Sequence, residues 1–338
     1  MARMKGWRAN FYVSLLGVAL FCATAVGQTA GDDEVVRIET DLATVEALVT
    51  DANGNIANNL RPEDFKLFED GVEMPLSFFS VAQRTRQPRP VAVVFALDVS
   101  GSVTAEELTQ MRRAVNAFTG RLGGPSSLFA ALAFGTQVKT VQSLTDDPAK
   151  LEKSLGKLAA DPNGLSTHAY DAVDDAIRLL TRKAPRTRAR RLLKRAVIVV
   201  SDGFPVGDTV APATVIERAN AADVSVYTVI LPSYSRLLAS KDRQPLPTPL
   251  DVSGLAEKTG GASLYANAND FEPLFRSLAE EVASTYVLSF YPAPEKRRDG
   301  RFHTLRVEVP RGYFVRQSRP GYQAANSKTK DNKRLTPN

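Results

Sequence analysis

The stretch VAVVFALDVSGS, residues 91–102, decides the fold of this chain. Its first seven residues form a continuous apolar run, which is typical of a strand buried on both faces of a parallel sheet. The run leads directly into Asp98, Ser100 and Ser102. In open α/β sheets, ligands bind at the carboxyl ends of such strands. The stretch therefore predicts an α/β domain with a polar site at one edge of its sheet.

Further along the chain, apolar runs of strand length alternate with segments of helical periodicity. The expected strands lie at 127–134, 196–200 and 225–231, and the expected helices at 104–122, 148–160, 169–182, 212–222 and 270–284. This alternation predicts a doubly wound, mostly parallel, Rossmann-like sheet covered by helices. We expect the α/β domain to span residues 91–285.

The segments on either side of this domain have β patterning. Residues 28–83 and 286–323 alternate between polar and apolar side chains, with turn signals at Asn53-Gly54, Asp70-Gly71 and Asp299-Gly300. The pattern predicts antiparallel strands of a small Ig-like sandwich, formed by both segments together or by each one separately. We expect residues 84–90 to be a linker and residues 324–338 to be a disordered basic tail.

The N-terminus resembles a secretory signal. Residues 1–8 carry three basic residues and no acid, and an apolar run from Phe11 to Gly27 follows. Small residues at the end of the run would permit cleavage after Ala25 or Gly27. We expect residues 1–27 to be a signal peptide, which directs export to the periplasm, the cell surface or the medium. The alternative is an uncleaved anchor, because about 17 apolar residues are the lower limit for spanning a bilayer.

Composition limits the chemistry of the site. Cys22 is the single cysteine and lies in the expected signal peptide, so no internal disulfide can form. His168 and His303 are the two histidines, which are too few for a structural Cys/His zinc site. Loss of the signal peptide would lower the net charge from +6 to +3, because three basic residues leave.

Residues 182–195, RKAPRTRARRLLKR, hold eight basic residues and no acid. This stretch is either a solvated helix end and loop or a patch for an anionic surface such as polysaccharide or lipid phosphate. Nucleic acid is disfavoured as a partner, because no recognition motif accompanies the stretch.

Oxygen-bearing side chains follow two of the expected strands. Asp98 follows the first run, and the run at 196–200 leads into Ser201-Asp202-Gly203. Carboxyl ends of parallel strands share one sheet edge, and Thr167 precedes an expected helix beside it. Carboxylate and hydroxyl oxygens suit Mg²⁺, Mn²⁺ or Ca²⁺. The expected metal ligands are Asp98, Ser100, Ser102, Thr167 and Asp202.

These pieces resemble the metal-ion-dependent adhesion site of von Willebrand factor type A (VWFA) domains. The resemblance rests on DVSGS at 98–102, Thr167 in LSTHAYDA and SDG at 201–203, and covers about residues 90–285. The flanking stretches LRPEDFKLFEDGV and STYVLSFYP are similar to the VWFA-related family of acidobacterial genomes, over about residues 35–323. This wider resemblance implies the architecture and an exported location. A cation with few anionic ligands keeps open coordination positions, and a Glu or Asp of a partner can fill one of them.

Three functions are compatible with this site. The leading hypothesis is a non-enzymatic protein that binds a protein or surface partner through the cation. One alternative is a metal-dependent hydrolase or phosphatase, although Ser100 stands where the phosphatase Asp-x-Asp pattern has its second acid. The other is an envelope module whose metal only stabilises the fold.

Neighbouring polar residues have simpler interpretations. We interpret His168 as a rim residue, because the sequence offers no third group to orient it as a base. Asp171, Asp174 and Asp175 are explained by their favourable interaction with the N-terminal end of a helix. His303, in an alternating strand, is expected to be structural.

Overall fold

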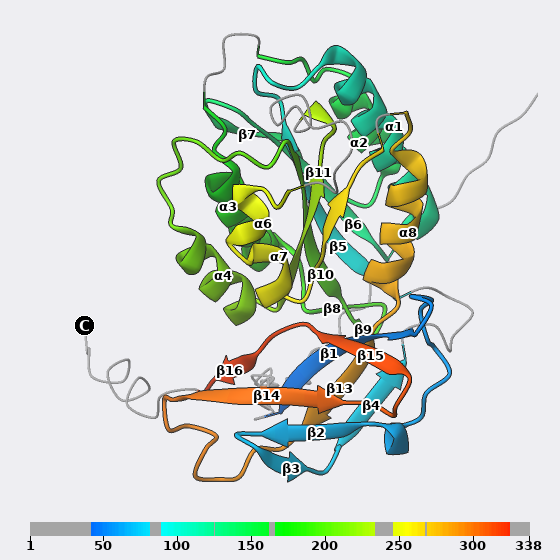
Figure 1. Ribbon diagram of the computed structural model, residues 1–338, viewed down its shortest axis with the longest axis vertical. Helices are drawn as coiled ribbons and strands as arrows, with labels where there is room; N and C mark the ends of the chain where they lie inside the picture. The colour runs from blue at the N-terminus through cyan, green and yellow to red at the C-terminus, as the bar shows by residue number, and fades with distance from the viewer. Residues whose placement is uncertain are drawn as a thin grey trace, which may run out of the picture. The chain divides into compact units, whose positions relative to one another are not determined.

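A computed structural model describes residues 42–81, 89–124, 126–161, 166–233, 246–267 and 269–324 (Figure 1). The expected signal peptide 1–27, most of the linker 84–90 and the tail beyond Ala324 lie outside the described residues. Within the described part of the chain, no helix combines the length and the apolar character needed to cross a membrane.

The α/β domain is built on a six-stranded sheet of order β12-β11-β10-β5-β6-β7. All neighbouring strands are parallel except β7, which pairs antiparallel with β6 at one edge. The mostly parallel sheet confirms the predicted fold class. The strands are β5 (Val91–Asp98), β6 (Leu128–Phe134), β7 (Val138–Thr145), β10 (Lys194–Ser201), β11 (Val224–Ile230) and β12 (Ser263–Tyr265).

Helices cover both faces of this sheet, which explains the continuous apolar runs (Figure 1). In β5, Val93 and Phe95 pack into one core while Val94 and Ala96 pack into the other. The first core is covered by α1 (Ala105–Leu122), α2 (Pro148–Leu155) and α8 (Glu272–Ala283). The second is covered by α3 (Ala169–Lys183), α4 (Pro212–Ala221), α6 (Pro249–Val252) and α7 (Leu255–Lys258). Full burial of each large apolar side chain contributes roughly 1.5–3 kcal/mol.

A capping box fixes the start of α1 directly after the DVSGS loop. Thr104 Oγ1 accepts the N–H of Glu107, and Glu107 Oε2 accepts the N–H of Thr104. The other oxygen of Glu107, Oε1, accepts the N–H of Ser233 at 2.8 Å, just after β11. The helix start is therefore fastened to a second loop at the same edge of the sheet.

The two flanks share two antiparallel sheets, of order β15-β1-β13-β4 and β16-β14-β2-β3. In the first sheet, C-terminal and N-terminal strands alternate, whereas in the second two C-terminal strands lie beside two N-terminal strands. The two sheets enclose a common core that includes Val45, Leu67, Tyr286 and Leu305. The N-terminal strands are β1 (Ala43–Asp51), β2 (Lys66–Glu69), β3 (Val72–Met74) and β4 (Phe78–Val81). The C-terminal strands are β13 (Tyr286–Phe290), β14 (Phe302–Glu308), β15 (Tyr313–Gln317) and β16 (Gly321–Gln323).

A buried ion cluster joins the antiparallel strands to the parallel sheet. Glu46 of β1 accepts from Arg89 Nη2 at 2.7 Å and from Lys194 Nζ, at the start of β10, at 2.6 Å. The side chains of both cations are at most 5% exposed. Burial alone raises the pKa of Glu46, but the charges of Arg89 and Lys194 outweigh it and lower the pKa to about 2. The carboxylate therefore stays ionised and holds the two cations together.

We expect Glu46→Ala to destabilise the protein by about 3–5 kcal/mol, because it leaves two buried cations without their counter-charge. Urea unfolding followed by circular dichroism would measure the loss. Glu63→Ala is the matched control, since Glu63 forms an ion pair with Arg61 in which both side chains are more than half exposed. That variant should lose under about 1 kcal/mol. Similar losses in the two variants would contradict the role given to Glu46.

Candidate metal centre

The parallel pairing of β5 with β10 brings the two predicted acidic ligands to one sheet edge. The register places Leu97 opposite Val200, so both strands end at the same level. Asp98 closes β5 and is fully buried, while Asp202 follows β10 and is 3% exposed. Ser201 Oγ donates to Asp98 Oδ2 at 2.7 Å across the two strand ends.

The DVSGS loop folds back on Asp98. Asp98 Oδ1 accepts the N–H of Ser100 at 2.8 Å, the Asx-turn geometry in which an aspartate bonds the backbone two residues on. This turn brings Ser100 Oγ to within 3.1 Å of Ser102 Oγ. Ser100 is buried and Ser102 is exposed, so the group of oxygens opens to solvent on the Ser102 side.

Thr167 is held to the loop that begins with Asp202. Its N–H donates to the carbonyl of Val206 at 2.9 Å, and the N–H of Val206 donates back at 3.0 Å. Side-chain hydrogen bonds thus link Asp98, Ser100 and Ser102, whereas Thr167 is joined to the Asp202 loop through the main chain. The remaining predicted ligand, Asp202, acts on Asp98 through its charge.

The site carries an excess of negative charge. Burial raises the pKa of Asp98 to about 6; hydrogen bonds from Ser100 and Ser201 oppose the shift, and the charge of Asp202 adds to it. No Lys, Arg or His in the described ranges forms an ion pair with Asp98 or Asp202. A divalent cation would supply the missing charge. The donor set consists of oxygens alone, which fits Mg²⁺, Mn²⁺ or Ca²⁺.

A second polar group lies beside these residues. His168, Asp171 and Asp208 bring one potential ligand atom each to within 4.8 Å of one another, so this group is of the kind that can hold a divalent cation. The interpretation of His168 as a residue without an orienting group was wrong, because Asp171 Oδ2 lies 3.0 Å from His168 Nδ1. The three-residue spacing on one helix turn was the available signal.

Asp171 also has a larger role than favouring the helix end. Its carboxylate accepts the N–H groups of Thr209 at 3.0 Å and Val210 at 2.9 Å. Asp208 Oδ1 in turn accepts the N–H of Asp171 at 2.9 Å in the first turn of α3. These bonds form a latch between the Thr167 segment and the loop after Asp202. Thr167 and Asp171 are four residues apart, about one helix turn. Both therefore bond the loop that follows Asp202, Thr167 through its main chain and Asp171 through its carboxylate.

A groove of about 870 Å³ adjoins the site. Its lining includes Val99, which stands between Asp98 and Ser100, and Gly135 and Asp161. The N–H of Asp161 donates to the carbonyl of Val99 at 2.7 Å, which connects the groove to the DVSGS loop. Lys139 and Lys157 add positive charge to its walls. The edge of the sheet therefore has room for a segment of another molecule.

Comparison with known sequences identifies the domain. Residues 92–245 match the family profile of the von Willebrand factor type A domain. This chain contains a von Willebrand factor type A domain. Human integrin alpha-D is 27% identical over 140 residues, which is 40% of this chain and 12% of the integrin. Mouse integrin alpha-X is 26% identical over 156 residues, 45% of this chain and 13% of the integrin. The match thus spans about an eighth of these curated relatives.

Solved structures with a similar domain are distant. A conserved hypothetical protein BatB from Bacteroides thetaiotaomicron has a TM-score of 0.42 at 17% identity, covering 57% of this chain and 97% of its own. Proximal thread matrix protein 1 of the mussel byssus was solved with a zinc-occupied metal-ion-dependent adhesion site (MIDAS) motif. It has a TM-score of 0.46 at 14% identity, over 62% of this chain and 49% of its own. A von Willebrand factor type A protein from Catenulispora acidiphila has a TM-score of 0.45 at 13% identity, covering 78% and 77%.

We expect Asp171→Ala to destabilise the VWFA domain by about 2–3 kcal/mol, because it leaves the N–H groups of Thr209 and Val210 without their charged acceptor. Chemical unfolding would measure the loss, and hydrogen exchange should be faster at the amides of Thr209 and Val210. Asp175→Ala is the control, since Asp175 lies on the same helix and is exposed. It should change stability by under about 0.5 kcal/mol. Unchanged exchange at both amides would rule out the latch.

Proposed function

We propose that this protein binds a protein or surface partner through a divalent cation at the carboxyl edge of its parallel sheet. The ligands would be Asp98, Ser100, Ser102, Thr167 and Asp202, with Mg²⁺, or Mn²⁺ or Ca²⁺, as the ion. The observation that carries the proposal is the pair of buried carboxylates, Asp98 and Asp202, without a cationic neighbour in the described chain.

The mixture of ligand types would keep the cation available to a partner. Three of the five proposed ligands are neutral hydroxyls, so the ion would keep part of its positive charge. Mg²⁺ binds through few protein carboxylates and keeps other positions for water or an incoming ligand. A carboxylate of the partner would occupy such a position beside exposed Ser102. The groove lined by Val99 and Lys139 would accommodate the residues that flank this carboxylate.

We propose binding rather than catalysis at this site. The hydroxyls of Ser100 and Ser102 bond each other, and neither contacts a histidine or lysine among the described residues. A serine nucleophile needs such a base to be activated. His168 is instead oriented by Asp171, within the latch. We place the protein outside the cytoplasm on the pattern of residues 1–27, and within the VWFA-related acidobacterial family on the flanking sequences.

We expect Mg²⁺ and Mn²⁺ to raise the melting temperature of the wild type, because an ion that binds only the folded state stabilises it. At 100 times the dissociation constant the gain is about 2.7 kcal/mol. The variant Asp98→Ala/Asp202→Ala should show no gain. The charge-matched control Asp175→Ala/Glu217→Ala removes two exposed acids and should respond like the wild type. If the metals raised the melting temperature equally in all three proteins, the assignment of Asp98 and Asp202 as metal ligands would be wrong.

The metal effect should also depend on pH. The pKa of Asp98 in the folded state is about 6, above its ordinary value of 3.8, so the folded protein holds this proton more tightly than the unfolded chain. Without metal, this favourable contribution is complete below pH 3.8 and is lost as the pH rises through 6. Mg²⁺ needs the ionised carboxylate, so its stabilisation should be large at pH 7.5 and shrink below pH 6. Thermal melts from pH 4.5 to 8 would show this, and a pH-independent shift would contradict it.

Pull-down from cell-envelope extracts tests partner binding itself. We expect the wild type to retain a partner in Mg²⁺ and to release it in EDTA, because the partner's carboxylate would bind the ion. Asp98→Ala/Asp202→Ala should retain nothing, while Asp175→Ala/Glu217→Ala should behave like the wild type. A metal-stabilised protein that captures no EDTA-sensitive partner would support the structural alternative. Turnover of phosphoesters that disappears in Asp98→Ala would support the hydrolase.

A further inference from the structure

The structure divides the basic stretch 182–195 into two parts. The predicted helix end is present, since α3 runs to Lys183, but a hairpin of β8 (Thr187–Arg188) and β9 (Arg191–Leu192) replaces the expected loop. Lys194 and Arg195 begin β10 and are only 2% and 9% exposed. Arg186, just before the hairpin, is exposed. Two of the eight cations are therefore buried, where a solvated surface patch would have none.

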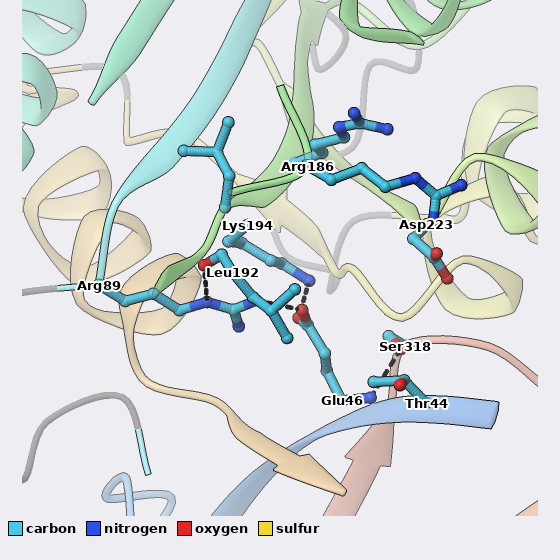
Figure 2. Close-up of a pocket in the computed structure, with 10 residues that line it drawn as sticks. Thr44, Glu46, Arg89, Arg186, Leu192, Lys194, Asp223 and Ser318 are labelled. Atoms are coloured by element: carbon cyan, nitrogen blue, oxygen red, sulfur yellow. Dashed lines mark hydrogen bonds and ion pairs between the residues drawn. The ribbon is translucent and has the colours of Figure 1, made fainter. Parts of the chain in front are cut away.

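These two cations face a small cavity between β1 and the start of β10. Figure 2 shows side chains from both sheets around it. The cavity measures about 120 Å³. Its polar lining consists of four cations, two acids and two hydroxyls: Arg89, Arg186, Lys194, Arg195, Glu46, Asp223, Thr44 and Ser318.

The charges around this cavity do not balance. Glu46 forms ion pairs with both Arg89 and Lys194. The second acid, Asp223, pairs with Arg319 at 2.8 Å. The lining thus holds two acids and four cations, and one of these acids is also paired with Arg319 outside the lining. Within the described part of the chain, neither Arg186 nor Arg195 has a carboxylate within ion-pair distance. The cavity is bordered by a net positive charge.

Arg195 carries the argument, because its charge is buried. Its guanidinium donates to the carbonyls of Ala184 at 2.7 Å and Ala222 at 3.4 Å, which follow the ends of α3 and α4. These helix ends offset part of the charge. Even so, burial lowers the pKa of Arg195 and the nearby charge of Arg186 lowers it further, while the charge of Asp223 opposes the shift only in part. A buried cation without a full counter-charge is costly, and an anion would remove that cost.

A buried donor without a hydrogen-bond partner lies next to a residue of the cavity lining. Arg319 follows Ser318, and its Nε is buried without a hydrogen-bond partner in the described structure. Ser318 Oγ accepts the N–H of Glu46 at 3.0 Å, so its own proton is available to another acceptor. Guanidinium and hydroxyl donors are the groups that bind phosphate and sulfate oxygens.

We propose that this cavity binds one tetrahedral oxyanion, of the phosphate or sulfate class, between Arg186, Arg195 and Ser318. The volume suits a single such group and excludes a polymer. Exposed Arg186 stands at the rim, so the anion is either free or the end of a larger molecule, such as a lipid headgroup. The bound anion would join the antiparallel strands to the VWFA domain.

This site is separate from the proposed metal centre. Lys194 begins β10 and Ser201 ends it, so seven residues of extended chain, about 23 Å, lie between the two. The anion site also uses none of the proposed metal ligands. Phosphate binding should therefore be unchanged in Asp98→Ala/Asp202→Ala, whatever that variant does to metal binding.

Calorimetric titration of the full chain with sodium phosphate, against sodium chloride at equal ionic strength, tests the proposal. We expect phosphate to bind and sulfate to compete. Arg186→Gln removes an exposed donor that the fold does not need, and should weaken phosphate binding about tenfold or more. Arg182→Gln is the matched control, since Arg182 is an exposed arginine of the same stretch that does not line the cavity. Binding should be as tight in this control as in the wild type.

Equal weakening in Arg186→Gln and Arg182→Gln would overturn the proposal, because it would indicate general screening of a basic surface. Absence of phosphate binding beyond the chloride control would overturn it as well. Sedimentation with vesicles of phosphatidylcholine, with and without phosphatidylglycerol, distinguishes the two sources of the anion. Retention on anionic vesicles that Arg186→Gln abolishes would assign a lipid headgroup. Phosphate binding without retention would assign a free anion.

Discussion

The pairing of β5 with β10 is the constraint on which the rest of the molecule depends. Both strands are buried along their whole length, so apolar packing on two faces fixes their register. Because the strands are parallel, their carboxyl ends lie at the same edge of the sheet, which brings Asp98 and Asp202 together there. The Asx turn at Ser100, the capping box of α1 and the latch at Asp171 then fix the loops that surround these acids.

How much the sequence could predict depends on whether the signal is local. The continuous apolar runs predicted β5 and β10, and the polar residues after each run followed from them. The latch partners of Asp171 are 38 and 39 residues away, with no pattern that connects them. The hairpin before β10 also lacked a signal, because its turn residues Ala189 and Arg190 have positive φ without the glycine or asparagine usual there. Strand β7 was missed because its side chains are only partly buried and form no continuous apolar run.

Strand β10 connects two places of opposite charge. Its carboxyl end leads to Asp202, beside buried Asp98, where negative charge is in excess. Its amino end begins with Lys194 and Arg195, where positive charge is in excess. The neutral, apolar middle of the strand, residues 196–200, keeps the two ends apart. The cation proposed for the first end and the anion proposed for the second therefore belong to separate sites on one strand.

The shared antiparallel sheets have a consequence for the order of folding. Thr44 of β1 contacts Ser289 of β13, 245 residues later in the chain, and closing so long a loop directly is slow. If the VWFA domain folds first, Arg89 at its entry and Thr285 at its exit come together, since Arg89 Nη1 donates to Thr285 Oγ1 at 3.0 Å. The long loop is then closed before β1 and β13 pair. During synthesis β2 and β3 could pair with each other, but β1 and β4 would wait for β13, which begins at Tyr286.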